Sequence, residues 1–321
     1  MRRSRGPRDA WMPRVPIPVL IDTDMGVDDA VAIALALLSR ELDVRALVSV
    51  GGNVDLDQAT RNIARQLAAM RPATLPMVGR GLDQHGPGLT DARHVFGADG
   101  LGECGLPDSD AIEVRELDDV YGEFLAGGDE LTIVAIGPLT NVAHALARYS
   151  DAMRRVRHLV IMGGALWCKG NVGAAEFNIH RDPASAAAVF ASGLPISVVP
   201  LDATRFVTFD ESHLAHLAAS ESRAGEFLAR VMAYPMQHST EAGPGRFVIH
   251  DALAVGACIW PELFVRTRLA IDVVTAGADA GRTRPRLAPG GAGIDAISGV
   301  NATDFLENLL ERLCQQREFG V

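Results

Sequence analysis

Short apolar runs alternate along the chain with amphipathic or alanine-rich segments. Apolar runs followed by helix-like segments are typical of βα units, in which strands lie parallel and helices connect them. The pattern therefore predicts an α/β fold with a mostly parallel central sheet flanked by helices. The predicted strand and helix pairs are 17–21 with 28–39, 44–50 with 56–70, 131–136 with 139–149, and 158–163 with 183–192.

The second half of the chain continues this pattern without a break between domains. We find no repeat of fixed period and no convincing linker, so residues 17–321 are predicted to form one domain. Residues 1–16 are basic and proline-rich and are expected to form a flexible arm before it. Further predicted elements are a strand in 194–201, a helical segment at 211–233, a short strand entering a helix in 247–259, and a late strand near an edge in 268–275.

The composition argues against several kinds of partner. The formal net charge of −10 disfavours nucleic acid, because phosphate backbones are bound by basic surfaces. The longest strongly apolar stretch, "AVAIALALL", is far shorter than the roughly 20 residues that cross a bilayer. The 4 cysteines form no C-x-x-C pair and are interpreted as reduced, mostly buried thiols. With no membrane span and no signal peptide recognised, the cytoplasm is the expected compartment.

Polar clusters recur at one kind of place, directly after predicted strands. In open α/β sheets, ligands bind beyond the carboxyl ends of the strands, so clusters that are distant in sequence are expected to converge there. The clusters are "DTDMGVDD" (22–29), "GGN" (51–53), "GPLTN" (137–141), "MGG" (162–164) and the pair at 250–251.

The first cluster contains four carboxylates within eight positions: Asp22, Asp24, Asp28 and Asp29. Asp28 and Asp29 could complement the dipole of the predicted helix and Asp24 could cap it, but this explains only one or two of the four. Four carboxylates at the end of a buried strand would raise one another's pKa and cost stability without a positive partner. No Lys or Arg lies between 15 and 39, so a bound cation is favoured over capping alone.

The residue types in this cluster indicate which cation. Carboxylate oxygens with no His or Cys nearby suit the hard cations Ca²⁺ and Mg²⁺ rather than zinc. Ca²⁺ takes about six to eight oxygens, so it would also recruit a backbone carbonyl and carboxylates from elsewhere in the chain. Asp251, directly after a predicted strand, is a natural candidate.

"DTDMGVDDA" resembles the N-terminal signature of the inosine-uridine preferring nucleoside hydrolase family, which usually has Pro where this chain has Met25. Further matching segments follow in order through most of the chain, and this order makes coincidence implausible. They are "VGGN" (50–53), "AIGPLTNVA" (135–143), "IMGGA" (161–165), "GNVGAAEFN" (170–178) and "IHDALAV" (249–255).

The resemblance implies hydrolysis of the N-glycosidic bond of ribonucleosides, with Ca²⁺ as cofactor. It implies that Asp24, Asp29, Asp251 and the main-chain carbonyl of Thr140 hold the Ca²⁺. Asp24 is also the implied general base, which takes a proton from a Ca²⁺-bound water that attacks the anomeric carbon. The transition state resembles an oxocarbenium ion, so negative groups around the sugar favour it.

The same resemblance assigns the substrate-binding residues. His250 is implied to protonate or polarise the departing base, although a lone His beside an apolar run is more often a packed core residue. Met162 is implied to lie under the sugar, although ordinary core filling explains it nearly as well. Without the resemblance, Asn53 and Asn171 would be interpreted as turn residues. The implied ribose-binding residues are Asp28, Asn53, Asn171, Glu176 and Asn178.

The chain also departs from the family pattern. Many relatives have "HG" before the "DGLG" loop, and that His lines the base pocket, whereas this chain has Phe96 there and His94 two positions earlier. Base recognition is therefore expected to differ. "GNVGAAEFN" lacks a residue that some members carry, which weakens the match at Asn171. Met25 in place of Pro changes only a residue that fixes φ at the turn.

Other readings stay open at this level. Aromatic residues beyond 220, namely Phe227, Tyr234 and His238, could cap the base, although helices would bury them anyway. A Mg²⁺-dependent phosphatase also begins Asp-x-Asp, but it needs Thr where this chain has Gly26. A ribose-binding module without turnover would not need both Asp24 and His250. Relatives are commonly homodimers or homotetramers, and the sequence leaves the preferred base undetermined.

Overall fold

The computed structural model of the chain describes residues 15–84, 91–128, 130–288 and 293–315. Of the arm predicted at 1–16, residues 1–14 lie outside this part. Among the described residues, no helix combines the length and the apolar character needed to cross a membrane. The four cysteines are unpaired, and each is partly rather than fully buried.

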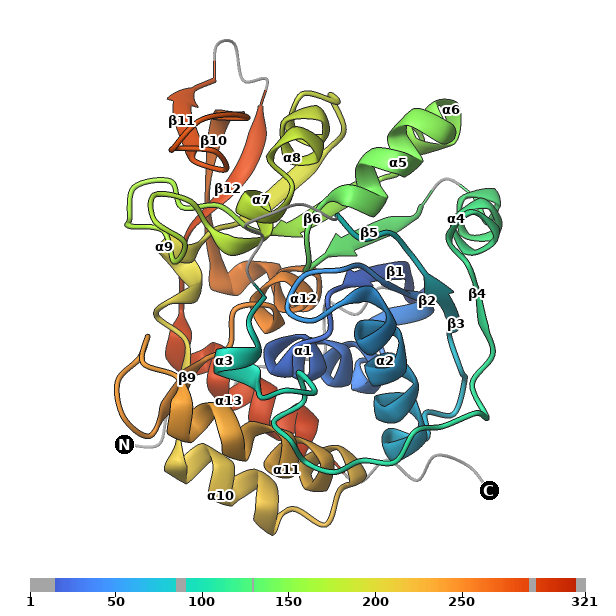
Figure 1. The fold of residues 1–321 in the computed structure, drawn as a ribbon, viewed down its shortest axis with the longest axis vertical. Helices are drawn as coiled ribbons and strands as arrows, with labels where there is room; N and C mark the ends of the chain where they lie inside the picture. Colours follow the sequence, from blue (N-terminus) through green and yellow to red (C-terminus); the bar gives the residue numbers. More distant parts are fainter. Residues whose placement is uncertain (1–14, 85–90, 129, 289–292, 316–321) are drawn as a thin grey trace, which may run out of the picture.

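A ten-stranded sheet crosses the molecule (Figure 1). From β12 to β4 all neighbouring strands pair in parallel, whereas β10 pairs antiparallel with both β11 and β12. The predicted mostly parallel α/β fold is confirmed. In spatial order the strands are β11 (Thr283–Leu287), β10 (Phe264–Val273), β12 (Ile294–Val300), β7 (Ile196–Val199), β6 (His158–Met162), β5 (Thr132–Ala135), β1 (Ile17–Thr23), β2 (Leu42–Ser49), β3 (Met77–Arg80) and β4 (Val114–Glu116).

Helices cover both faces of the sheet, in two hydrophobic layers (Figure 1). Side chains of a strand point alternately to the two faces, so Val19 and Ile21 of β1 join one layer and Leu20 joins the other. The first layer contains α1 (Val27–Leu38), α2 (Leu56–Met70), α11 (Arg223–His238), α12 (Ala252–Ile259) and α13 (Ala302–Leu313). The second contains α4 (Leu117–Ala126), α5 (Thr140–Arg148), α6 (Ser150–Met153) and α8 (Pro183–Phe190).

Helix α1 is the most buried helix of the first layer. Only Leu37 of its residues is not fully buried, because α1 packs against α11, α12 and α13 as well as the sheet. A helix that is apolar on all sides is stable only inside such a layer. Its two acidic residues in the first turn, Asp28 and Asp29, are therefore carried into the interior at the carboxyl edge of the sheet.

The predicted elements are present, with one correction. The segment 211–233 is not one helix: α10 (Glu211–Ala219) ends before α11 begins, and Ser222 caps the start of α11 by accepting the N–H of Gly225. The predicted late strand is β10, next to the edge strand β11. The remaining short elements are α3 (Arg93–Phe96), α7 (Phe177–Arg181), α9 (Leu201–Thr204), β8 (Thr208–Asp210), β9 (Arg246–Val248) and the 3₁₀ turn η1 (Pro261–Leu263).

The parallel strands β1, β2 and β5 end at one edge of the sheet, and hydrogen bonds extend the pairing into the loops beyond it. The N–H of Val50 donates to the carbonyl of Thr23 at 2.9 Å, and the N–H of Ile136 donates to the carbonyl of Asp22 at 2.8 Å. These bonds hold the loops that follow β2 and β5 against the loop that follows β1. Three of the polar clusters are thereby brought together.

Candidate active site

The loop after β1 turns the chain sharply into α1. Met25, at its centre, has φ 54°, and Gly26 is the N-cap of the helix. Asp29 closes this turn: its carboxylate accepts the N–H of Gly26 at 2.8 Å and the hydroxyl of Thr23 at 2.5 Å. The capping role considered for Asp24 is therefore wrong, and the Asp24 carboxylate forms its hydrogen bonds with another loop. Proline cannot adopt the φ of Met25, so the loss of the usual Pro is a change of backbone shape and not a neutral exchange.

Asn53, in the loop after β2, holds two of the carboxylates. Its backbone N–H donates to Oδ2 of Asp24 at 2.8 Å, and its side-chain amide donates to Oδ1 at 3.0 Å. The same amide lies 3.1 Å from Oδ2 of Asp29. Asn53 is thus more than a turn residue, because from the loop after β2 it orients the carboxylates of Asp24 and Asp29 in the loop after β1 and at the start of α1.

Two glycines allow the loops to approach Asp24 this closely. A Cβ at Gly52 would lie 2.1 Å from Oδ2 of Asp24, and a Cβ at Gly137 would lie 2.9 Å from the Asp24 nitrogen. Neither distance is possible for a real side chain. Gly52 of "GGN" and Gly137 of "GPLTN" are therefore required by the approach of their backbones to Asp24.

We expect a Gly52→Ala variant to lose activity by at least about 100-fold while staying folded, because the added methyl displaces the Asp24 carboxylate. Hydrolysis of the ribonucleosides that the resemblance implies as substrates measures the first effect, and circular dichroism measures the second. Gly122→Ala in α4 is the matched control, since its Cβ would meet only the side chain of Tyr149, with the hydroxyl at 3.6 Å. Wild-type activity in Gly52→Ala would contradict this placement of Asp24.

Three buried carboxylates form a compact group at this edge. Oxygens of Asp28, Asp29 and Asp251 all lie within 4.8 Å of one another, and the three residues are 5 %, 0 % and 3 % exposed. Oδ1 of Asp28 has no hydrogen-bond partner among the described residues. An oxygen-only set with an unpartnered buried oxygen fits a hard cation such as Ca²⁺.

Burial and mutual repulsion raise the pKa of every carboxylate in this region. Burial, followed by the charge of Asp29, raises the pKa of Asp28 to about 7 and that of Asp24 well above its usual range. Burial also raises the pKa of Asp251, and the neighbouring carboxylates Asp28, Asp29 and Asp24 add to the effect. Asp24 is thus electrostatically part of the group, although its own oxygens are held to one side by Asn53.

Asp22, the first acidic residue of the sequence cluster, is not part of this group. Its Oδ2 accepts the hydroxyl of Tyr121 at 2.9 Å and the amide of Asn141 at 3.0 Å. Burial raises its pKa to about 7. Asp22 therefore belongs to the packing between β1 and the second helical layer.

Glu176 and Asn178 lie at the start of α7, where the loop that follows β6 enters the helix. Glu176 is the N-cap of α7 and accepts three backbone N–H groups, those of Gly164, Asn178 and Ile179, at 2.9–3.1 Å. The amide of Asn178 donates to the carbonyl of Ile136 at 3.0 Å. Met162, the last residue of β6, is within 3.5 Å of the same amide and is 3 % exposed.

His250 lies directly before Asp251, at the start of α12. Its Nδ1 pairs with the hydroxyl of Thr204 at 2.7 Å, and its Nε2 lies 3.3 Å from Oε2 of Glu241. Burial lowers its pKa, but the carboxylate of Glu241, together with Asp28 and Glu176, outweighs this and raises the pKa overall. His250 therefore contacts Glu241 directly, and the charge of Asp28 adds to the effect of Glu241 on its pKa.

The remaining predicted site residues are placed less directly. Phe96 is 7 % exposed and lies over the loop after β1, since a Cβ at Gly26 would be 3.0 Å from its ring. Thr140 is the first residue of α5, and its hydroxyl donates to Asp182 at 2.8 Å. Asn171 is exposed, and its Oδ1 accepts the N–H of Phe177 at 2.9 Å.

The three aromatic candidates for covering the base do not form one surface. Phe227 is 3 % exposed and packs in the first hydrophobic layer. Tyr234 and His238 stack on each other with ring centroids 3.9 Å apart. Only the latter pair has solvent access.

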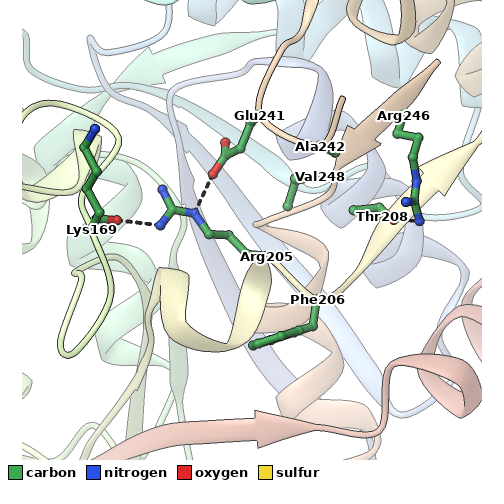
Figure 2. A pocket seen from close by; sticks show the side chains of 8 residues that line it. All are labelled: Lys169, Arg205, Phe206, Thr208, Glu241, Ala242, Arg246 and Val248. Atoms are coloured by element: carbon green, nitrogen blue, oxygen red, sulfur yellow. Dashed lines mark hydrogen bonds and ion pairs between the residues drawn. The ribbon is translucent and has the colours of Figure 1, made fainter. Parts of the chain in front are cut away.

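Sequence analysis missed the residues that surround His250. Glu241 pairs with both His250 and Arg205, the latter at 2.7 Å, and Thr204 precedes Arg205 at the end of α9. None of them lies in a recognisable motif. Thr204 is 46 positions from His250 and Arg205 is 36 positions from Glu241, whereas Glu241 is 9 positions from His250. A pocket of about 510 Å³ opens beside them (Figure 2); it is lined by Lys169, Arg205, Phe206, Thr208, Glu241, Ala242, Arg246 and Val248.

Comparison with known proteins places this geometry in context. Residues 19–307 match the family described as inosine-uridine preferring nucleoside hydrolase. The chain is 34 % identical over 265 residues to a pyrimidine-specific ribonucleoside hydrolase from Citrobacter koseri, which spans 81 % of this chain and 85 % of that protein. It is 35 % identical over 269 residues to a non-specific ribonucleoside hydrolase from Klebsiella pneumoniae, with the same coverage.

Solved structures agree with the sequence relatives. A plant nucleoside hydrolase superposes with a TM-score of 0.84 at 32 % identity, covering 93 % of this chain and 99 % of that one. A purine-preferring ribonucleoside hydrolase from Gardnerella vaginalis superposes with a TM-score of 0.85 at 28 % identity, covering 92 % and 98 %.

Proposed function

The chain belongs to the inosine-uridine preferring nucleoside hydrolase family and hydrolyses the N-glycosidic bond of ribonucleosides; from this premise we propose that Asp24 is the general base, that His250 assists the leaving base, and that Ca²⁺ is the cofactor. The observation that carries the proposal is the buried group of Asp28, Asp29 and Asp251, whose charges act on both Asp24 and His250. Binding alone would not need both an acid and a base.

The donor set suits the proposed cation. Asp24, Asp29, Asp251 and the carbonyl of Thr140 would hold it, and Asp28, within the same compact group, faces it or a sugar hydroxyl. A bound Ca²⁺ supplies positive charge that lowers the pKa of the surrounding carboxylates and of a water molecule it contacts. Without such charge, burial raises the pKa of these carboxylates and favours their protonated forms.

Asp24 is suited to the base role when it is ionised. Asn53 fixes both of its oxygens, so the carboxylate has one orientation toward the water that attacks the anomeric carbon. Positive charge then develops on the sugar ring, and the acidic surroundings stabilise it. We assign the ribose hydroxyls to Asp28, Asn53, Asn171, Glu176 and Asn178, with Met162 under the ring and Phe96 on the side of the base.

His250 is suited to the acid role because the neighbouring carboxylates raise its pKa, which favours the protonated form. Thr204 fixes Nδ1, which leaves the proton on Nε2 to be shared between Glu241 and a departing base. The base leaves more easily when it receives this proton.

A Ca²⁺-dependent release of ribose tests the proposal. Inosine, adenosine, uridine and cytidine are each incubated with the purified protein and Ca²⁺, and the ribose released is measured as reducing sugar. A Ca²⁺ concentration of about 1 mM is used, because it saturates even weak sites. Release from at least one nucleoside is the expected result. No release from any of them with Ca²⁺ present would overturn it.

We expect His250→Ala to lower kcat by about 100-fold or more for inosine, but by much less for p-nitrophenyl riboside, whose leaving group needs no proton. Steady-state kinetics with both substrates measures the difference. His216→Ala in α10 is the matched control. An equal loss for the two substrates would show that His250 does not act on the leaving group.

We expect Ca²⁺ affinity to weaken as pH falls below about 7. Asp28 has a pKa of about 7 without the cation, so below that pH a proton must leave before Ca²⁺ binds. One displaced proton weakens binding about tenfold per pH unit, and further coupled carboxylates add to this. Isothermal titration calorimetry at pH 6 and pH 8 measures it, and equal affinities would contradict it.

Two earlier alternatives are set aside, and one expectation is kept. Because the chain belongs to the nucleoside hydrolase family, we no longer consider it a Mg²⁺-dependent phosphatase or a ribose-binding module without turnover. We further propose that the chain forms a homodimer or homotetramer, as the resemblance implies. Size-exclusion chromatography with light scattering tests it, and a monomer at micromolar concentration would refute it.

A further inference from the structure

Glu241 connects the pocket beside His250 to the candidate active site. Glu241 both lines it and reaches Nε2 of His250, and its charge is also felt at Asp28. Its volume of about 510 Å³ suits a planar base with a substituent. Because His250 is placed on the side of the leaving base, this pocket lies where the base or its substituents extend.

The charge of the pocket is opposite to that of the protein. Lys169, Arg205 and Arg246 line it together with a single carboxylate, Glu241, so two positive charges are in excess. The guanidinium of Arg205 is neutralised by Glu241 at 2.7 Å. The guanidinium of Arg246 donates to the hydroxyl of Thr208 at 3.1 Å, and no described carboxylate forms an ion pair with Arg246 or with Lys169.

The pocket also offers a surface for an aromatic ring. Phe206 lines it and is 70 % exposed, which is high for so large an apolar side chain. Figure 2 shows the Phe206 ring on one side and Arg246 and Thr208 on another, with Arg205 between Lys169 and Phe206 and Glu241 next to Arg205. A planar base can stack on such a ring while an anionic substituent meets the guanidinium.

The relatives leave the choice of base open. The proteins named above are described as pyrimidine-specific, non-specific and purine-preferring, at similar identity to this chain. The shared framework therefore does not decide which base is taken. A positively charged pocket in an acidic chain is a place where the choice of base can be decided.

We propose that this pocket selects ribonucleosides whose base carries a carboxylate, with Arg246 as its main partner and Lys169 in support. The inference rests on the proposed function, since it assumes that the base leaves on the side of His250. A carboxylate gains charge-assisted bonds to Arg246 that the neutral base lacks. The attraction between this carboxylate and Arg246 also offsets the repulsion that the buried acidic group would exert on an anionic substrate.

Matched substrates test the proposal. Orotidine and uridine differ by one carboxylate on the base, and uridine 5′-monophosphate places the negative charge on the sugar instead. In wild type with Ca²⁺, kcat/KM for orotidine is expected to exceed that for uridine by about tenfold or more. Arg246→Gln should lower this ratio about tenfold, and Lys169→Gln should lower it by less. Arg40→Gln, an exposed arginine in the turn after α1, is the control and should leave the ratio unchanged.

The outcomes separate this inference from the proposed function. Uridine hydrolysis with a ratio at or below one, a ratio unaffected by both pocket variants, or a preference for the 5′-monophosphate overturns the inference alone. Equilibrium titration of wild type with orotidine and uridine covers the remaining case. Tighter binding of orotidine that depends on Arg246, without release of ribose, supports the pocket and contradicts the proposed function.

Discussion

An Asp24→Asn variant is expected to lower kcat at least about 1000-fold, with a much smaller effect on nucleoside binding. Asparagine has the same size, so it fits beneath Gly52, but it cannot accept a proton from water. Its amide also meets the donors of Asn53 where the carboxylate accepted them. The variant loses the general base and also one negative charge near the positive charge that develops on the sugar. Both losses slow the same step, the attack of water on the anomeric carbon.

Single-turnover hydrolysis and nucleoside binding measured on the same preparation separate the chemical step from binding. Asp57→Asn, an exposed carboxylate on α2, is the matched control and should keep wild-type kcat. Thermal unfolding of both variants detects misfolding. Wild-type kcat in folded Asp24→Asn would remove Asp24 from the reaction.

Removal of Ca²⁺ is expected to lower both activity and stability. Chelation leaves the carboxylates of Asp24, Asp28, Asp29 and Asp251 buried without a positive partner, and each then has a raised pKa. Activity should fall at least about 100-fold and return when Ca²⁺ is added. Ca²⁺ at 100 times its Kd stabilises by about 2.7 kcal/mol, so Tm should fall by roughly 5 °C on its removal.

Calorimetry with and without EGTA, alongside metal analysis of the treated protein, measures this. EGTA already saturated with Ca²⁺ is the control and should change nothing. Full activity in protein shown to be free of metal would contradict the cation site.

The chemistry of the first cluster could be predicted from the sequence, but the division of labour within it could not. Four carboxylates without a nearby cation indicated a hard metal ion, and Asp28 and Asp29 were placed in the first turn of a helix. The sequence could not separate Asp22, which pairs with Tyr121 across 99 positions. Nor could it show that Asp29, rather than Asp24, closes the turn.

The surroundings of His250 were outside the reach of the sequence for the same reason. Its neighbour Asp251 and the apolar run of α12 are adjacent in the chain, so the resemblance located them. Glu241, Arg205 and Arg246 reach the pocket from separate loops and elements, and no periodicity links them. The charge of the pocket is therefore a property of the folded chain.

By itself, the sequence determined the alternation of strands and helices, the parallel sheet, and the polar clusters after each strand, because hydrophobic periodicity and turn residues are local. The tertiary structure decided which carboxylates meet, how Gly52 and Asn53 fix Asp24, and which Lys and Arg side chains line the pocket beside His250. These depend on contacts between residues far apart in the chain, whose partners are set only when the two helical layers close on the sheet.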